Sequence, residues 1–288
     1  MAEAHGGYYL PQPSHWPITG SITLFILFFS TASWFQGAAW GPWGMLLGFA
    51  LLLVLLFGWF GTVIGESEGH LYDAQVDRTF RWAMAWFIFT EVMFFGGFFG
   101  ALFYARIFSV PWLGGDDVAT NVLLWGGQAL DWPMHMAPGL KDLEFEFMPA
   151  WPLATFNTIF LLSSSVTVTI AHHALKEGDR DKVKKFMLIT VALGVLFLLV
   201  QVYEFHHAWT SENLTLASGV YGSTFFMLTG FHGFHVTIGT IGLITITARI
   251  YRGHFTPEHH FGFEGIAWYW HFVDVVWLGL FIFVYILA

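Results

Sequence analysis

The sequence has 288 residues, of which 56% are hydrophobic and only 11% are charged, and its formal net charge is −9. A soluble domain carries about 25% charged residues. The composition therefore excludes an ordinary soluble enzyme, a disordered chain and a nucleic-acid-binding protein. The sequence contains no cysteine, which excludes a disulfide framework, a thiolate metal site and a cysteine nucleophile. We expect a protein whose surface is solvated by lipid.

The first apolar stretch, positions 4 to 65, contains no Asp, Glu, Lys or Arg. Because a helix needs about 20 apolar residues to cross a bilayer, this stretch predicts two membrane helices, near 17–37 and 43–65. Gly37 and Gly41-Pro42 mark the turn between them. An acidic residue and several prolines near the beginning do not fit a signal peptide.

Further apolar stretches predict helices near 81–106, 153–175, 184–208, 221–248 and 265–287. The predicted fold is all-α and polytopic, with seven transmembrane helices in a single membrane domain over 1–288. Within it, helices 1 and 2 (about 17–65) could form a sub-bundle beside helices 3–7 (about 81–287). A long outer loop over about 109–151 is polar and aromatic, which is typical of amphipathic stretches at a membrane surface.

The basic residues lie mostly on one side of this topology. Arg106 and Lys141 fall on the side opposite the amino terminus, and the other nine of the 11 Lys and Arg residues fall on the amino-terminal side. Cytoplasmic loops carry the excess of Lys and Arg. The bias predicts a cytoplasmic amino terminus.

Few ionisable groups lie within the predicted spans, and each is costly in hydrocarbon. They include Glu91, Glu204, His232, His235, His271 and Asp274. Glu91 lies near the middle of helix 3, where it could be a proton-accepting carboxyl or a neutral acid hydrogen-bonded between helices. The sequence leaves both interpretations open.

Two pairs of these residues are spaced three apart and therefore share a helix face: His232 with His235, and His271 with Asp274. Facing helices could build a haem or metal site from such pairs. The alternative is interhelical hydrogen bonding and packing, helped by small residues that let helices approach closely. Those small residues are Gly230, Gly233 and Gly239.

Four runs of the sequence resemble the cytochrome c oxidase subunit III family. They are HHFGFEGIAWYWHFVDVVWL (259–278), YGSTFFMLTGFHGFHVTIGT (221–240), AHHALKEGDR (171–180) and RWAMAWFIFTEVMFFGGFFGALFY (81–104). The resemblance covers nearly the whole chain. The loop before Trp151-Pro152 departs from the family's shorter stretch, so no loop function is carried over. Seven spans argue against the related quinol oxidase subunit, which has fewer.

The resemblance implies an accessory core subunit of a proton-pumping cytochrome c oxidase, which oxidises cytochrome c and reduces oxygen to water. Subunits I and II would hold the haem and copper centres, so this chain alone would not be catalytic. The intramembrane histidines, Glu204 and Asp274 would then have structural roles. By motif position Glu91 matches a carbodiimide-reactive carboxyl that influences the pumped protons without conducting them.

The resemblance also implies that a lipid-filled cleft separates the first two helices from the other five. By motif position, the lipid-binding residues are Trp59, Glu66, His70 and Arg249. For Arg249 a plain positive-inside anchor is an equal alternative, and Trp59 could be an ordinary interfacial residue. His5 and His15, on the inner face, could support proton uptake.

Two competing functions remain: an autonomous haem or metal membrane oxidoreductase, and a proton transporter based on Glu91. The second is disfavoured because the sequence shows neither inverted repeats nor broken helices. The length and the long loop favour a bacterial plasma membrane over the mitochondrial inner membrane.

Overall fold

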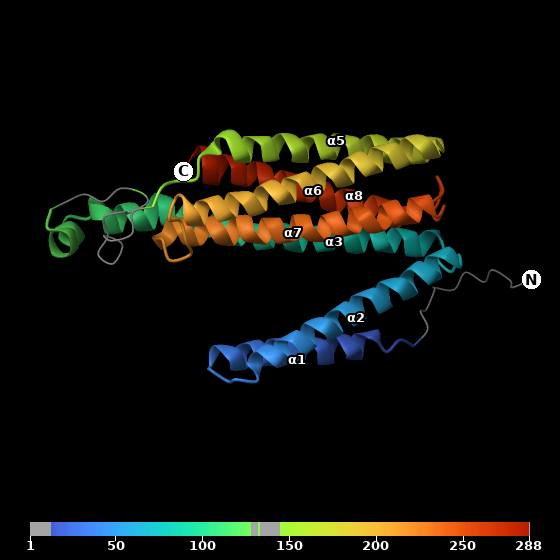
Figure 1. Cartoon of the computed structure of the whole chain (residues 1–288), viewed down its shortest axis with the longest axis horizontal. Helices are drawn as coiled ribbons and strands as arrows, with labels where there is room; N and C mark the ends of the chain where they lie inside the picture. The colour runs from blue at the N-terminus through green and yellow to red at the C-terminus, as the bar shows by residue number, and fades with distance from the viewer. Residues whose placement is uncertain (1–12, 128–131, 133–144, 288) are drawn as a thin grey trace, which may run out of the picture. The chain divides into compact units, whose positions relative to one another are not determined.

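The computed structural model describes residues 13–127, 132 and 145–287 (Figure 1). In this described part, seven helices are long and apolar enough to cross a membrane. The predicted all-α class and number of spans are therefore confirmed. No β-strand occurs among the described residues, as expected where each backbone polar group must be satisfied within the lipid.

The long helices are α1 (Trp16–Phe35), α2 (Gly41–Glu68), α3 (Ala74–Tyr104), α5 (Thr155–Glu177), α6 (Arg180–Thr210), α7 (Gly219–Tyr251) and α8 (Phe261–Leu280). Shorter helical segments are η1 (Ala105–Ser109), η2 (Trp112–Asp116), α4 (Val118–Thr120), η3 (Asn121–Trp125), η4 (Ala150–Ala154) and η5 (Phe281–Ile286). The chain divides into two compact units, Met1–Phe80 (unit 1) and Arg81–Ala288 (unit 2).

Unit 1 contains an antiparallel pair, α1 and α2, joined by the predicted turn. Gly37 has a φ of 87° just after α1, a conformation that suits glycine because it has no Cβ. Pro42 lies in the first turn of α2, where its missing N–H costs no hydrogen bond. At Gly48, a Cβ atom would lie 2.8 Å from the Leu27 Cα. The two helix backbones therefore need a glycine at this crossing.

Unit 2 is a bundle in which α5, α6, α7 and α8 pack side by side with the part of α3 from Arg81 onward (Figure 1). The sharp turn between α5 and α6 uses Gly178, at φ 77°, and Asp179, whose carboxylate accepts a hydrogen bond from the Lys182 N–H at 3.0 Å. An acidic cap of this kind satisfies an otherwise unpaired amide at the start of a helix.

The core of unit 2 is aromatic, and α8 supplies much of it. The side chains of Trp270 and Trp277 are fully buried. Trp270 fills the space left by two glycines, because a Cβ at either Gly194 or Gly239 would lie 2.9 Å from its ring. The expected close approach at Gly239 is thus present. Among the described residues, a Cβ at Gly230 would meet no atom within 4 Å, so the expected close approach within this chain is not found at Gly230.

The third span differs from its predicted limits. α3 begins at Ala74, and helical segments continue it as far as Trp125, so the first part of the predicted 109–151 loop is helical. The Asp117 carboxylate accepts hydrogen bonds from the Thr120 N–H and hydroxyl, both at 2.8 Å. The Trp125 indole N–H donates to the Leu113 carbonyl. These local bonds stabilise helical turns that polar composition alone did not predict.

Candidate functional site

The intramembrane acid Glu91 is hydrogen-bonded between helices. Its Oε2 lies 3.0 Å from Nε2 of His235 on α7, and the other ring nitrogen of His235 lies 2.6 Å from the Phe231 carbonyl oxygen. The Glu91 and His235 side chains are 21% and 10% exposed. No sequence pattern links these two residues. The structure brings them together across α3 and α7.

Aromatic rings surround His235. The centroids of Phe94 and Phe95 lie 6.0 Å and 5.0 Å from its ring, and Tyr269 of α8 lies at 6.4 Å. The Tyr269 hydroxyl donates to the His235 carbonyl at 3.4 Å. The imidazole is thus fixed by packing as well as by its two polar contacts.

His232, one turn earlier on α7, has a different environment. It is fully buried, and its Nε2 lies 3.3 Å from the Val273 carbonyl oxygen on α8. Phe197 and Trp277 contact its ring with centroids 5.6 Å and 5.1 Å away. The polar contact of His232 is therefore to backbone, as the packing interpretation predicts.

His271 and Asp274 lie on α8 against α5. The His271 Nδ1 is 2.5 Å from the Ser165 hydroxyl, and its Nε2 is 3.3 Å from the Thr169 hydroxyl. The Asp274 Oδ2 is 3.9 Å from the His271 Nδ1. The predicted pair is thus close, but the nearest polar partners of the imidazole are two hydroxyls that the sequence analysis missed.

Glu204 is fully buried in α6, and its Oε2 accepts a hydrogen bond from the Gln201 amide at 2.9 Å. Gln201 was not singled out, although an amide one helical turn from an intramembrane acid is a readable signal. Apart from the Glu91–His235 contact and the longer approach of Asp274 to His271, the polar contacts described above are to other kinds of residue. Across the described ranges, no group of three or more His, Cys, Asp or Glu is arranged to hold a metal ion.

Three of the residues matched to lipid binding lie in unit 1. Trp59 projects from α2 with 47% of its surface exposed. Glu66, near the end of α2, accepts a hydrogen bond from the Tyr72 hydroxyl at 2.6 Å. His70 follows α2 with a φ of 54°. Glu66 and His70 lie at the end of α2, where a polar side chain can reach lipid headgroups, and Trp59 lies about two and a half turns earlier in the helix.

The fourth, Arg249, lies in unit 2 at the end of α7. Its guanidinium carbon is 4.5 Å from the Phe255 ring centroid, and the side chain is half-buried. Nearby, Arg180 donates to the Phe255 carbonyl at 3.1 Å, and the Lys184 ammonium lies 5.5 Å from the Tyr251 ring centroid. This end of unit 2 is therefore cationic and aromatic, a composition typical of a membrane interface.

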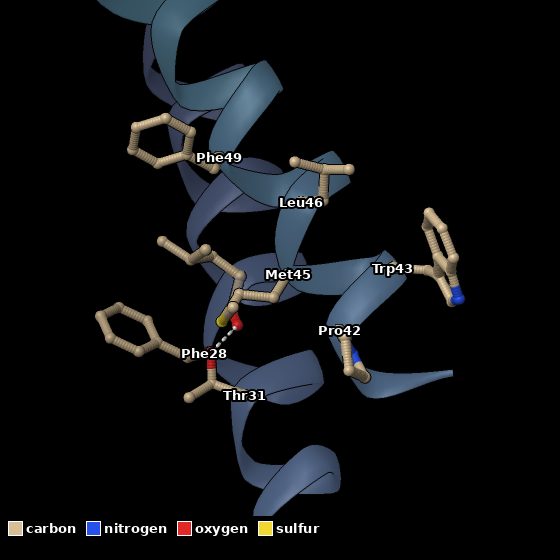
Figure 2. A pocket seen from close by; sticks show the side chains of 8 residues that line it. Phe28, Thr31, Pro42, Trp43, Met45, Leu46 and Phe49 are labelled. Atoms are coloured by element: carbon tan, nitrogen blue, oxygen red, sulfur yellow. Dashed lines mark hydrogen bonds between the residues drawn. The ribbon is translucent and has the colours of Figure 1, made fainter. Parts of the chain in front are cut away.

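A hollow of about 630 Å³ lies on unit 1 between α1 and α2 (Figure 2). Figure 2 shows Phe28 and Phe49 on one side of it and Trp43 projecting away on the other. The Thr31 hydroxyl donates to the Leu27 carbonyl of its own helix at 2.7 Å, so the lining is essentially apolar. It contains none of the predicted site residues.

Of the two amino-terminal histidines, His15 stands just before α1, and its ring centroid is 4.3 Å from that of Trp16. His5 lies outside the described residues. The Arg81 guanidinium of α3 pairs with Glu264 of α8 through Nε and Nη2, at 3.0 Å and 2.9 Å. No local sequence pattern predicts this ion pair, because its members are 183 positions apart.

Comparison with known proteins gives a consistent result. A family model described as cytochrome c oxidase subunit III matches residues 6–124 and 139–288. The cytochrome c oxidase subunit 3 proteins of Tragelaphus oryx, Bos mutus grunniens and Loxodonta africana are each 39% identical to this chain over 287 residues. These alignments cover 99% of this chain and 98%, 99% and 98% of the three relatives, respectively.

The stretch of the chain between residues 124 and 139 is not matched by the family model, and it lies inside the loop that departs from the family pattern. The match extends over all seven described spans. The chain belongs to the cytochrome c oxidase subunit III family.

Proposed function

We propose that this chain is an accessory core subunit of a proton-pumping cytochrome c oxidase, a complex that oxidises cytochrome c and reduces oxygen to water. The observation that carries the proposal is the family match along almost the entire chain. Subunits I and II hold the haem and copper centres, and this chain stabilises subunit I. In support, His232, His235 and His271 each make a polar contact within unit 2.

The test is affinity purification of the native chain from its own membranes, followed by absorption spectroscopy and identification of the companion proteins. The expected preparation contains subunits I and II, shows haem absorption and oxidises cytochrome c. The chain purified alone is expected to be colourless. A haem band retained by the isolated chain would contradict the proposal and favour an autonomous membrane oxidoreductase.

Phospholipid binding is the second part of the proposal, with Trp59, Glu66, His70 and Arg249 as the contacting residues. A guanidinium can form a bidentate pair with a lipid phosphate, and Arg249 lies at a helix end among other cationic groups. The R249Q variant is expected to lower the amount of phospholipid that copurifies with the oxidase. R252Q is the matched control, because Arg252 is exposed just beyond the same helix. Equal lipid loss in both variants would contradict a specific site.

The distribution of Lys and Arg favours a cytoplasmic amino terminus. The membrane that we propose is a bacterial plasma membrane. A reporter that is active only outside the cytoplasm, fused after Ala288, is expected to be active. The same reporter inserted in the α5–α6 turn is expected to be silent. The opposite pattern would reverse the proposed topology.

Support of proton uptake is the last part, with His5 and His15 at the inner face; Glu91, inside the span, influences the pumped protons without conducting them. Imidazoles titrate near neutral pH and can buffer protons at a surface. Replacement of both amino-terminal histidines is expected to slow oxidase turnover at high pH, where protons are scarce. Unchanged turnover there would remove these two residues from the proposal.

A further inference from the structure

The Glu91–His235 contact has an unusual constraint at the far side of the imidazole ring. The Nδ1 of His235 lies 2.6 Å from the Phe231 carbonyl oxygen. A carbonyl oxygen only accepts hydrogen bonds, so Nδ1 carries a proton and donates it. In a neutral imidazole the second nitrogen, Nε2, then has a lone pair and no proton.

This tautomer determines which group donates the hydrogen bond between Glu91 and His235. The Glu91 Oε2 lies 3.0 Å from Nε2, within hydrogen-bonding distance. A carboxylate and a bare Nε2 would both be acceptors and could not bond. One proton must therefore lie between them, supplied either by a carboxylic acid at Glu91 or by an imidazolium at His235.

The surroundings favour the carboxylic acid. The imidazole is packed against Phe94, Phe95 and Phe234, with ring centroids within 6.0 Å. Separating charge between an imidazolium and a carboxylate in such apolar surroundings requires desolvation of two ions. A neutral acid that donates to a neutral imidazole avoids this cost and keeps the hydrogen bond.

We propose that Glu91 and His235 form a proton-sharing latch between α3 and α7, in which neutral Glu91 donates to His235 Nε2. His235 is the positioning residue, because its backbone contact to Phe231 fixes the tautomer that accepts the proton. The latch goes beyond the general influence of Glu91 on the pumped protons: the proton is held in the hydrogen bond and joins two helices. Its existence does not depend on the oxidase function of the complex.

The latch makes opposite predictions for two replacements at position 91. A glutamine can still donate to Nε2 through its amide N–H. The oxidase carrying E91Q is therefore expected to keep this subunit and to retain its turnover. A leucine cannot donate a hydrogen bond, so E91L leaves the His235 Nε2 unpaired. This variant is expected to lower the amount of the subunit that stays in the purified complex. A proton-relay role predicts instead that E91Q and E91L fail equally in turnover, and that result would overturn the proposal.

Infrared spectroscopy of the purified complex, with this subunit's glutamates labelled with 13C, locates the proton directly. The wild-type complex is expected to show a protonated-carboxyl band that disappears in E91Q. In H235Q, whose side-chain oxygen can accept, the band is expected to persist at a shifted frequency. In H235L it is expected to shift to the position of a carboxyl without an imidazole partner.

Glu204 provides the internal control, because it is a buried acid in the same unit that bonds to Gln201 rather than to histidine. Any band from Glu204 is expected to stay unchanged in the His235 variants. The absence of an E91Q-sensitive protonated-carboxyl band in the wild-type complex would overturn the proposal. An E91Q-sensitive band that is unaffected in both His235 variants would also overturn it. These spectra do not depend on whether turnover is altered.

Discussion

Trp270 of α8 donates its indole N–H to the Ser164 hydroxyl of α5 at 2.8 Å. Two helical turns further along α8, the Trp277 indole makes the same kind of bond to Thr158 of α5 at 2.9 Å. Both indoles are fully buried. In lipid, where helices gain little from hydrophobic burial against one another, bonds of this kind fix which faces of two helices meet.

Removal of one acceptor tests this pairing. S164A leaves a buried indole N–H unpaired, and we expect it to destabilise the folded subunit by about 1–2 kcal/mol. Thermal release of the subunit from the purified complex measures the effect. The control is S163A, because Ser163 is the exposed neighbour of Ser164 on the same helix. Equal effects of the two substitutions would contradict a role for the bond.

Two glycines of α7 form a matched pair for a steric test. A Cβ at Gly239 would lie 2.9 Å from the Trp270 ring, whereas one at Gly230 would meet no atom of the described part of the chain within 4 Å. We expect G239A to cost about 1–3 kcal/mol through overpacking, and G230A to be neutral or slightly stabilising through helix propensity. Detergent or heat denaturation of the two variants measures the difference. Tolerance of G239A would show that Trp270 can move away.

The ion pair between Arg81 and Glu264 links α3 to α8. The two side chains are 32% and 15% exposed, so water screens part of the attraction, and we expect the pair to contribute about 1 kcal/mol or less. A double-mutant cycle with R81Q and E264Q, measured at low and high salt, gives the coupling. R78Q is the control, because Arg78 is exposed on the same helix. A coupling of zero at low salt would exclude a stabilising role.

Asp117, beyond the end of the third span, gives a pH-dependent prediction. Hydrogen bonds from the Thr120 N–H and hydroxyl lower the pKa of this carboxyl below its ordinary value of 3.8. Its stabilising effect is therefore fully present above pH 3.8 and is lost as the pH falls through the lowered folded-state pKa. Hydrogen-exchange protection of the Thr120 amide, corrected for the intrinsic rate, is expected to fall over that range.

The D117N variant is the control for this measurement. Its side-chain oxygen still accepts from the Thr120 N–H but does not titrate, so protection is expected to be independent of acid pH. The same acid loss in D117N would assign the effect to another group.

The match of the observed spans to the predicted ones has a simple cause. In hydrocarbon a single apolar stretch can satisfy its own backbone only as a helix, so length and composition are sufficient to locate it. The α1–α2 turn was also predictable, because Gly37 and Pro42 impose local backbone conformations. The helical segments over 105–125 were missed because their bonds, such as Asp117 to Thr120, do not depend on hydropathy.

The sequence by itself determined the helical class, the number of spans and the set of polar side chains within them, because each of these follows from local composition. Only the tertiary structure decided which polar side chains meet. Glu91 and His235 are 144 positions apart, and the only pairing of His235 that the sequence indicated was with His232, three residues earlier on the same helix. Helix packing rotates each span about its axis, and that rotation, which no local pattern specifies, selects the partners.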